Sequence, residues 1–218
     1  LANEVLDAMP VEKFRIADDI QQAYVDINND QLMWRWLPAS TELRDAVVQL
    51  DIDFAEGYES EINLWIPGWV NSLSDCLSRG EVLMIDYGFP RREYYHPERS
   101  MGTIMCHYQH RAHSDPLIHV GLQDITAHVD FTAVAEAAVA HQFEVAGYTH
   151  QAAFLIDCGI TDLLSNAKDD IERFNWNNQV KQLTLPSEMG ELFKVIALTK
   201  DFEQPLIGFQ SLDLIERL

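Results

Sequence analysis

The sequence places a carboxylate directly after a short apolar run. Residues 82–85 are four consecutive apolar side chains, and Asp86 and Tyr87 follow them before Gly88. A run that is apolar on both faces is typical of a strand buried in a parallel sheet. In open α/β sheets, ligands gather just beyond the carboxyl ends of such strands. We therefore expect the strand to end at Asp86 and Gly88 to form a turn. Asp86 is then either a ligand contact or a cap for the segment that follows.

Histidines are the second group that could do chemistry, because five of the eight lie between His96 and His119. His107, His110 and His113 are three residues apart, so on a helix they would spread around about half of its circumference. Zinc requires three or four converging ligands. The side chains that could complete such a set are Asp115, Asp124 and His128. No HExxH spacing occurs, so substrate-facing or structural histidines are favoured and no metal site is predicted.

Other catalytic motifs are missing from these residues. There is no GxSxG nucleophile motif, and Cys106 beside His107 is an adjacency without a mechanism. The ten glycines are scattered, and neither GxGxxG nor a Walker loop is present. The given residues therefore contain no glycine-rich loop of the kind that grips a nucleotide-like cofactor.

Composition sets broad limits on the protein's partners. The chain has 218 residues, 47% of them hydrophobic, and a formal net charge of −20. These values indicate a folded globular protein whose surface repels nucleic acids and anionic membranes. A basic protein partner or a small ligand suits this charge, although acidity also serves solubility. Three separated cysteines without a CxxC pair favour a reducing compartment.

The coarse pattern indicates alternating strands and helices. Residues 11–38 alternate and predict two or three antiparallel strands with a turn at 28–30. Ser40 or Thr41 is a suitable cap for a helix that Gly57 ends, and Pro67 is a suitable start for the next one, which Gly80 ends. Residues 89–127 are rich in proline, glycine and histidine, and we expect them to be irregular. The remaining predictions are an Asp130-capped helix, a strand over 143–148, a helix over 152–156, a polar helical or irregular stretch over 165–182 and a strand over 192–198.

Three stretches together resemble a known enzyme family. The first is Ala2-Asn3-Glu4-Val5-Leu6-Asp7-Ala8-Met9-Pro10-Val11, and the second is Ile85-Asp86-Tyr87-Gly88 with Arg99, Gly102-Thr103 and His110. The third is Gly121 with Asp124-Ile125-Thr126-Ala127-His128-Val129-Asp130-Phe131, followed by Gln151, Phe154-Leu155, Gly159-Ile160, Met189-Gly190 and Phe193-Lys194-Val195. These motifs resemble the MidA-like family of class I S-adenosylmethionine-dependent methyltransferases. Its mitochondrial members methylate an arginine of a respiratory complex I subunit during assembly.

The resemblance implies an α/β, Rossmann-like fold with a mostly parallel sheet and an antiparallel final strand. It implies a small β insertion at about 11–38 and an irregular insertion at about 89–127. The family's glycine-rich cofactor loop lies before the first motif, so we expect the amino-terminal half of the fold to be absent. Residues 1–218 would then be the carboxyl-terminal portion of one methyltransferase domain, inactive alone.

The resemblance also implies roles for individual residues. Glu4, Asp86 and Asp124 would be catalytic, and Asn3 and Glu4 would contact the cofactor, S-adenosyl-L-methionine. A carboxylate at the Glu4 position could hold a guanidinium by paired hydrogen bonds or act as a general base. Asp7 could instead cap the helix that follows. The residues expected to bind the protein substrate are Asp7, Tyr87, His110, Thr126, His128 and Asp130.

The predicted function is S-adenosylmethionine-dependent methylation of a protein partner, with arginine as the expected acceptor. The alternative is a non-catalytic assembly or docking module that keeps the fold and binds a basic partner. We expect a basic or arginine-bearing protein substrate, no nucleic acid, no membrane, and an oligomeric state that includes a homodimer as an option. The expected compartment is the bacterial cytoplasm or the mitochondrial matrix.

Overall fold

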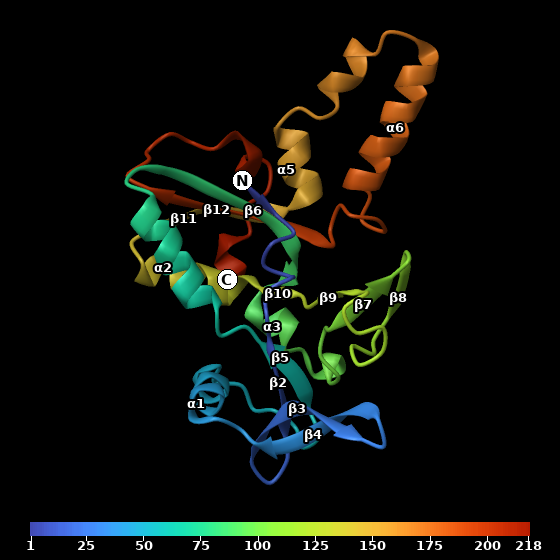
Figure 1. Ribbon diagram of the computed structural model, residues 1–218. Coiled ribbons are helices and arrows are strands. Elements are labelled where there is room, and N and C mark those ends of the chain that lie inside the picture. The colour runs from blue at the N-terminus through green and yellow to red at the C-terminus, as the bar shows by residue number, and fades with distance from the viewer. The chain divides into compact units, whose positions relative to one another are not determined.

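The computed structural model describes residues 1–218 and divides into two compact units (Figure 1). Unit 1 contains Leu1–Val5, Pro67–Arg91 and Val129–Leu218. Unit 2 contains Leu6–Ile66 and Arg92–His128. Each unit is built from segments that are distant in the sequence. Pairing between those segments therefore has to stabilise each unit. The two predicted insertions, about 11–38 and 89–127, fall almost entirely within unit 2.

A mixed five-stranded sheet forms the centre of unit 1. Its order is β1 (Ala2–Asn3), β6 (Gly80–Phe89), β12 (Phe193–Lys200) and β11 (Glu144–His150), and β10 (Val129–Asp130) also pairs with β6. Both β1 and β10 run parallel to β6, whereas β12 is antiparallel to β6 and to β11. The predicted antiparallel final strand is confirmed. Strand β12 lies between β6 and β11, and these two strands run in the same direction.

The core of this sheet lies along β12, whose residues Val195 to Leu198 are fully buried. Strand β6 is longer than predicted and continues to Phe89, so the expected turn at Gly88 is wrong. Gly88 serves close packing instead, because a Cβ there would lie 2.2 Å from the Val129 carbonyl oxygen. The bare backbone of Gly88 thus allows β10 to reach β6.

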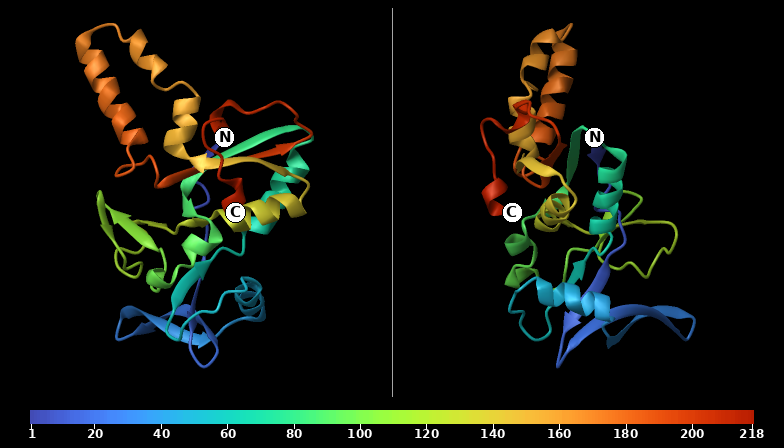
Figure 2. Two further views of the ribbon diagram at one scale, coloured as in Figure 1. Left: turned by 180° about the vertical axis from the view of Figure 1, so that it is seen from behind. Right: turned by 90° about the vertical axis from the view of Figure 1, so that its left-hand side faces the viewer.

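Helices flank the sheet of unit 1. Asp130 caps α4, as predicted, and α2 begins beside Pro67, although it ends at Cys76, before Gly80. Both views in Figure 2 show α5 and α6 extending away from the sheet as a helical arm. The helices associated with this unit are α2 (Ile66–Cys76), α4 (Phe131–Ala140), α5 (Gln151–Asp157), η2 (Asp162–Asn166), α6 (Asp170–Thr184), η3 (Ile207–Phe209) and η4 (Ile215–Arg217). None of the chain's helices has the length and apolar character needed to span a bilayer.

Unit 2 contains a four-stranded antiparallel sheet in the order β4, β3, β2, β5. Its strands are β2 (Glu12–Ile16), β3 (Ile20–Asn28), β4 (Gln31–Pro38) and β5 (Glu59–Ile62). The predicted antiparallel strands and their turn are confirmed: Asn29 and Asp30 have φ values of 49° and 60°, as a two-residue hairpin turn requires. Ser40 caps α1 (Thr41–Gln49), which ends well before Gly57.

The segment expected to be irregular contains regular structure. A second sheet of unit 2 has the order β8 (Arg111–His113), β7 (Met105–Tyr108), β9 (Asp124–Thr126). Two short helices, α3 (Arg91–Tyr94) and η1 (Pro97–Arg99), precede it. His107 and His113 therefore lie on strands, not on a helix. The expectation of an irregular insertion is met only in part, because residues 114–123 contain no helix or strand, whereas β7, β8 and β9 are strands too short for an apolar alternation to reveal them.

Candidate functional site

The carboxyl end of β1 presents a small polar cluster in unit 1. The Glu4 carboxylate accepts a hydrogen bond from the Tyr87 hydroxyl at 2.9 Å and another from the Asn3 amide at 2.9 Å. Asn3 and Glu4 are exposed, and Glu4 has a φ of 50°, which is uncommon for a residue other than glycine. Backbone strain of this kind gathers at functional sites. Three residues predicted for the site are thus in direct contact.

Asp86 fixes the backbone next to this cluster by hydrogen bonds. Its two carboxylate oxygens accept the backbone N–H groups of Val5 at 3.1 Å and of Tyr87 at 2.9 Å. The residue is 1% exposed and lies inside β6, not beyond its end. The Glu4 N–H also donates to the Ile85 carbonyl at 2.9 Å. Asp86 therefore fixes the backbone of Tyr87 and of Val5, the residue after Glu4, which favours a positioning role over direct contact with an acceptor.

Asp130 ends β10 and begins α4. One of its oxygens accepts from the N–H groups of Thr132 and Ala133, and the other accepts from Arg91 Nε at 3.3 Å. Burial raises the pKa of Asp130, and the Arg91 charge opposes that shift. Arg91 also makes a bidentate pair with Glu136. The predicted substrate-binding residue is thus a buried helix cap held by an arginine that the sequence did not single out.

Two further polar residues lie in the row across the sheet from Asp86. Lys194 on β12 pairs in register with Asp86, and His150 on β11 pairs with Lys194. Lys194 is 4% exposed, donates to the Leu192 carbonyl at 3.3 Å, and has its Nζ 5.2 Å from the centre of the Phe89 ring. Burial and the Lys194 charge lower the pKa of His150. The family resemblance included Lys194 among its motif residues but implied no role for it, and sequence reasoning missed His150. A further signal was the presence of a lysine within the otherwise apolar run 192–198.

In unit 2, three of the sequence motifs meet. The Ala127 N–H donates to the Asp7 carbonyl at 2.9 Å, and the His128 N–H donates to Thr103 Oγ1 at 3.0 Å. Asp7 is 4% exposed and does not cap a helix that follows it. The segments around residues 7, 103 and 128 therefore form one connected framework.

A buried glutamate that sequence reasoning missed supports this framework. Glu61 on β5 is fully buried, accepts the Thr103 N–H at 2.7 Å and lies 3.5 Å from Lys13 Nζ. Burial raises the pKa of Glu61, and Lys13 and the Thr103 N–H oppose the shift. Gly102 has a φ of 81°, and a Cβ there would lie 2.0 Å from a Glu61 carboxylate oxygen. The carboxylate thus holds the backbone at 102–103 in a conformation that only glycine accommodates easily.

The other predicted residues of unit 2 lie outside the framework formed around residues 7, 103 and 128. His110 is exposed at the turn between β7 and β8 and has a φ of 64°, so it serves the hairpin turn. Asp124 is exposed on β9, and Thr126 Oγ1 donates to the Met105 carbonyl at 3.4 Å. The structure brings together no set of three or more His, Cys, Asp or Glu side chains suited to a metal ion.

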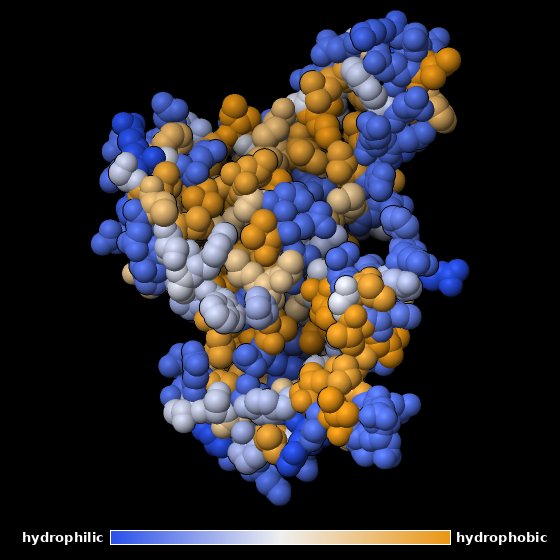
Figure 3. Space-filling model, in the orientation of Figure 1, coloured by the Kyte–Doolittle hydropathy of each residue, from blue (hydrophilic) through white to orange (hydrophobic).

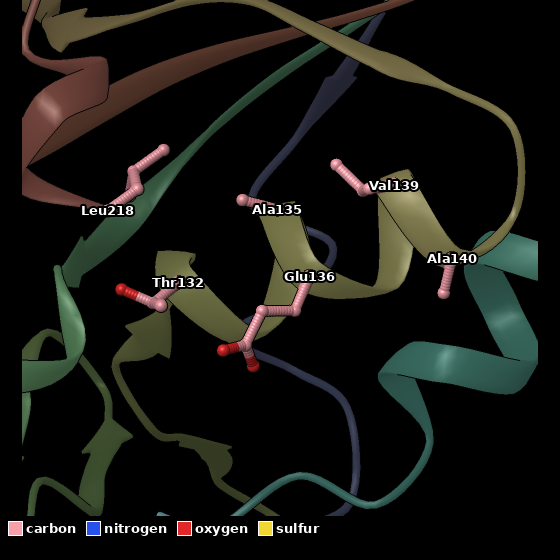
Figure 4. Close-up of a pocket in the computed structure, with 6 residues that line it drawn as sticks. All are labelled: Thr132, Ala135, Glu136, Val139, Ala140 and Leu218. Carbon is pink, nitrogen blue, oxygen red and sulfur yellow. The ribbon is translucent and has the colours of Figure 1, made fainter.

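An apolar pocket of about 440 Å³ lies along α4 in unit 1. Figure 4 shows Ala135 and Val139 on one face of the helix, with Leu218 opposite and the Glu136 carboxylate turned away from Leu218. The pocket contains none of the residues predicted for the site. Its only polar side chains are those of Thr132 and Glu136, whereas a ligand site usually has several convergent polar groups.

Together, these features define an α/β protein with polar side chains at the carboxyl end of its parallel strands, where ligands bind in this class. Residues 1–149 match the family described as "Putative S-adenosyl-L-methionine-dependent methyltransferase", and the chain belongs to that family. The predicted family resemblance is therefore confirmed.

Two solved structures and one curated protein are similar to this chain. A native crystal structure of a COG1565 superfamily protein from Burkholderia thailandensis is 41% identical, with a TM-score of 0.94 over 99% of this chain and 59% of that one. A COG1565 superfamily member from Burkholderia thailandensis bound to S-adenosyl-homocysteine is also 41% identical, with a TM-score of 0.89 over 99% of this chain and 57% of that one. The "Protein arginine methyltransferase NDUFAF7 homolog, mitochondrial" of Drosophila melanogaster is 25% identical over 96% of this chain and 50% of its own length.

The chain spans about half the length of the curated relative it matches. The superposition over 99% of the chain confirms the α/β fold with a mixed sheet. It does not by itself support the prediction that the amino-terminal half of the fold is absent.

Proposed function

We propose that this protein transfers a methyl group from S-adenosyl-L-methionine to a nitrogen of a protein substrate, with arginine as the acceptor. The observation that carries the proposal is the exposed Glu4 carboxylate at the carboxyl end of β1, held by Tyr87 and Asn3. The family, the S-adenosyl-homocysteine-bound neighbour and the arginine methyltransferase relative support it.

The polar groups at the end of β1 fit the methyl donor in chemical terms. S-adenosyl-L-methionine, when bound, supplies an electrophilic methyl group on a positively charged sulfur. An exposed carboxylate and an exposed amide suit the cationic and polar groups of its methionine portion. Asn3 and Glu4 would hold that portion, as the family resemblance implies. Their fixed backbone, tied to β6 through Asp86, means that little reorganisation is needed to bind it.

The Glu4 carboxylate also suits the acceptor. An arginine nitrogen is a poor nucleophile while its positive charge is spread over the guanidinium. A carboxylate that accepts paired hydrogen bonds localises that charge and can take the proton that the nitrogen loses on methylation. The Tyr87 hydroxyl, 2.9 Å from Glu4, orients the carboxylate for this contact.

The test is methyl transfer by the purified Glu4→Gln protein to a basic protein or an arginine-containing peptide. We expect turnover to fall by about 10²-fold or more, because general bases contribute at least that much. Glu81→Gln is the matched control, since Glu81 is an exposed carboxylate at the opposite end of β6. Wild-type turnover in Glu4→Gln would refute the role of Glu4.

Calorimetric titration with S-adenosyl-homocysteine separates catalysis from the alternative of a docking module. A methyltransferase should release heat on binding the product, whereas a module that only docks a basic partner should show none. No heat from the folded protein would refute the proposed function.

A further inference from the structure

Strand β4 is an open edge of the four-stranded sheet in unit 2. The turn at Asn29 and Asp30 closes the pair Asn28–Gln31, and from there the pairs with β3 alternate in hydrogen bonding. Gln31, Met33 and Arg35 therefore direct their N–H and C=O groups towards β3. The same groups of Leu32, Trp34 and Trp36 point away from the sheet. The edge thus offers backbone donors and acceptors to another extended chain.

A groove adjoins this edge within the same unit. Its volume is about 740 Å³, and its lining includes Leu32 and Trp34 of β4 with Leu117 and Ile118 of the segment that follows β8. Leu32 and Ile118 are 37% and 44% exposed. Figure 3 shows apolar residues gathered on this side of unit 2. An apolar floor beside an open strand edge is the arrangement by which sheets bind extended peptides, with pockets for alternate side chains.

The charge of the groove selects the occupant. The two charged side chains in its lining are both acidic, Asp30 at the hairpin turn and Asp115 after β8. The chain as a whole carries a net charge of −20. A second copy would bring the same acids together and repel itself, whereas a cationic segment would be attracted.

We propose that the β4 edge and its groove bind an extended segment of a protein partner, in which apolar side chains alternate with arginine or lysine. The segment pairs with the outward backbone groups of Leu32, Trp34 and Trp36. Its apolar side chains enter the groove, and its cations face Asp30 and Asp115. Insofar as the partner is the methyl acceptor, this inference rests on the proposed function. It adds a docking site separate from the Glu4 cluster.

The test uses a fluorescein-labelled peptide in which arginine or lysine alternates with valine or leucine, titrated with the purified protein by fluorescence anisotropy. We expect binding that weakens as sodium chloride is added. The Asp30→Asn and Asp115→Asn double variant should bind at least about tenfold more weakly, a change of about 1.4 kcal/mol. Asparagine tolerates the left-handed conformation of Asp30 and keeps the acceptor for the Leu117 N–H. Asp45→Asn, at an exposed carboxylate on α1, is the matched control.

Two further measurements test backbone pairing. The same peptide with N-methyl groups at alternate positions cannot donate to the edge, and we expect at least about a tenfold loss of affinity. Leu32→Pro removes an outward N–H without removing a β3–β4 bond, so it should weaken binding while the thermal unfolding midpoint stays near the wild-type value. Should this variant unfold, the N-methylated probe with the wild-type protein still decides the point.

Each outcome has a definite meaning. Equal binding of the N-methylated and unmodified peptides, or of the double variant and Asp45→Asn, would overturn the inference. A dimer that is detected by sedimentation and whose formation the double substitution alters would also overturn the inference, since a second copy would then occupy the edge. Peptide binding without product binding or methyl transfer would leave the docking site standing and refute the proposed function. Methyl transfer without peptide binding would leave the proposed function standing and refute the docking site.

Discussion

The contact between Glu61 and Gly102 makes the strongest single-residue prediction. Gly102 and Gly57 have nearly equal φ values of 81° and 82°, but a Cβ at Gly57 meets nothing within 4 Å. Gly57→Ala should therefore cost only the left-handed conformation, about 1–2 kcal/mol. Gly102→Ala should cost about 1–3 kcal/mol more, because its methyl group would overlap the buried Glu61 carboxylate.

The free energy of unfolding in urea measures both glycine variants. The difference between them isolates the steric contact, since the conformational cost is common to both. Equal losses would contradict the close approach of Glu61 to residue 102. Adding Glu61→Ala to Gly102→Ala should recover part of the extra loss, as coupled neighbours do in a double-mutant cycle.

Single residues also show where sequence reasoning reached its limit. The position of Asn3, Glu4 and Tyr87 in one cluster was predictable from the family resemblance, which assigned all three to the site. The burial of Asp86 was not, since an acidic residue after an apolar run reads the same whether it faces a ligand or two backbone N–H groups. Glu61 gave no signal at all. The second glutamate of Glu59-Ser60-Glu61 looks like an exposed strand residue until its partners Lys13 and Thr103 are placed.

At the scale of elements, the cap of α4 can be tested directly. Asp130→Ala removes both the acceptor for the first turn and one partner of Arg91, and we expect it to lower the free energy of unfolding by about 1–2 kcal/mol or more. Asp130→Asn keeps the capping oxygen, and Arg91 keeps Glu136, so this variant should lose less. Urea unfolding followed by circular dichroism measures both changes.

Asp169→Ala is the control for a cap on an exposed helix. Asp169 caps α6 by accepting the Glu172 N–H at 2.8 Å, but no residue of α6 is buried. Its loss should fray the helix locally and change global unfolding less than Asp130→Ala does. A larger global effect of Asp169→Ala would contradict the view that α4 is the element tied to the sheet.

Elements with a local signal were predicted well, and those defined by distant pairing were not. Ser40, Pro67 and Asp130 mark helix starts because their caps act within one turn. The turn at Asn29 and Asp30 was clear for the same reason. Strand β9, in contrast, exists because Asp124–Thr126 pairs with β7 nearly twenty residues earlier in the chain, and its three residues are too few to predict a strand on their own. The extension of β6 to Phe89 likewise depends on β10 reaching Gly88.

At the scale of the whole molecule, the net charge of −20 should make stability depend on salt. Self-repulsion among so many carboxylates opposes the folded state. Exposed ion pairs such as Arg44–Asp19 act in the opposite sense, but each contributes only about 0–1 kcal/mol. We therefore expect the thermal unfolding midpoint to rise between about 0.01 M and 0.15 M sodium chloride, as the Debye length falls from about 30 Å to about 8 Å.

Calorimetric scans at constant pH measure this shift. Screening requires the rise to level off above that range, because a further increase to 1 M shortens the Debye length by only about 5 Å, compared with about 22 Å below it. A steady rise into molar salt would instead indicate exclusion of salt from apolar surface, and a falling midpoint would mean that ion pairs outweigh the repulsion.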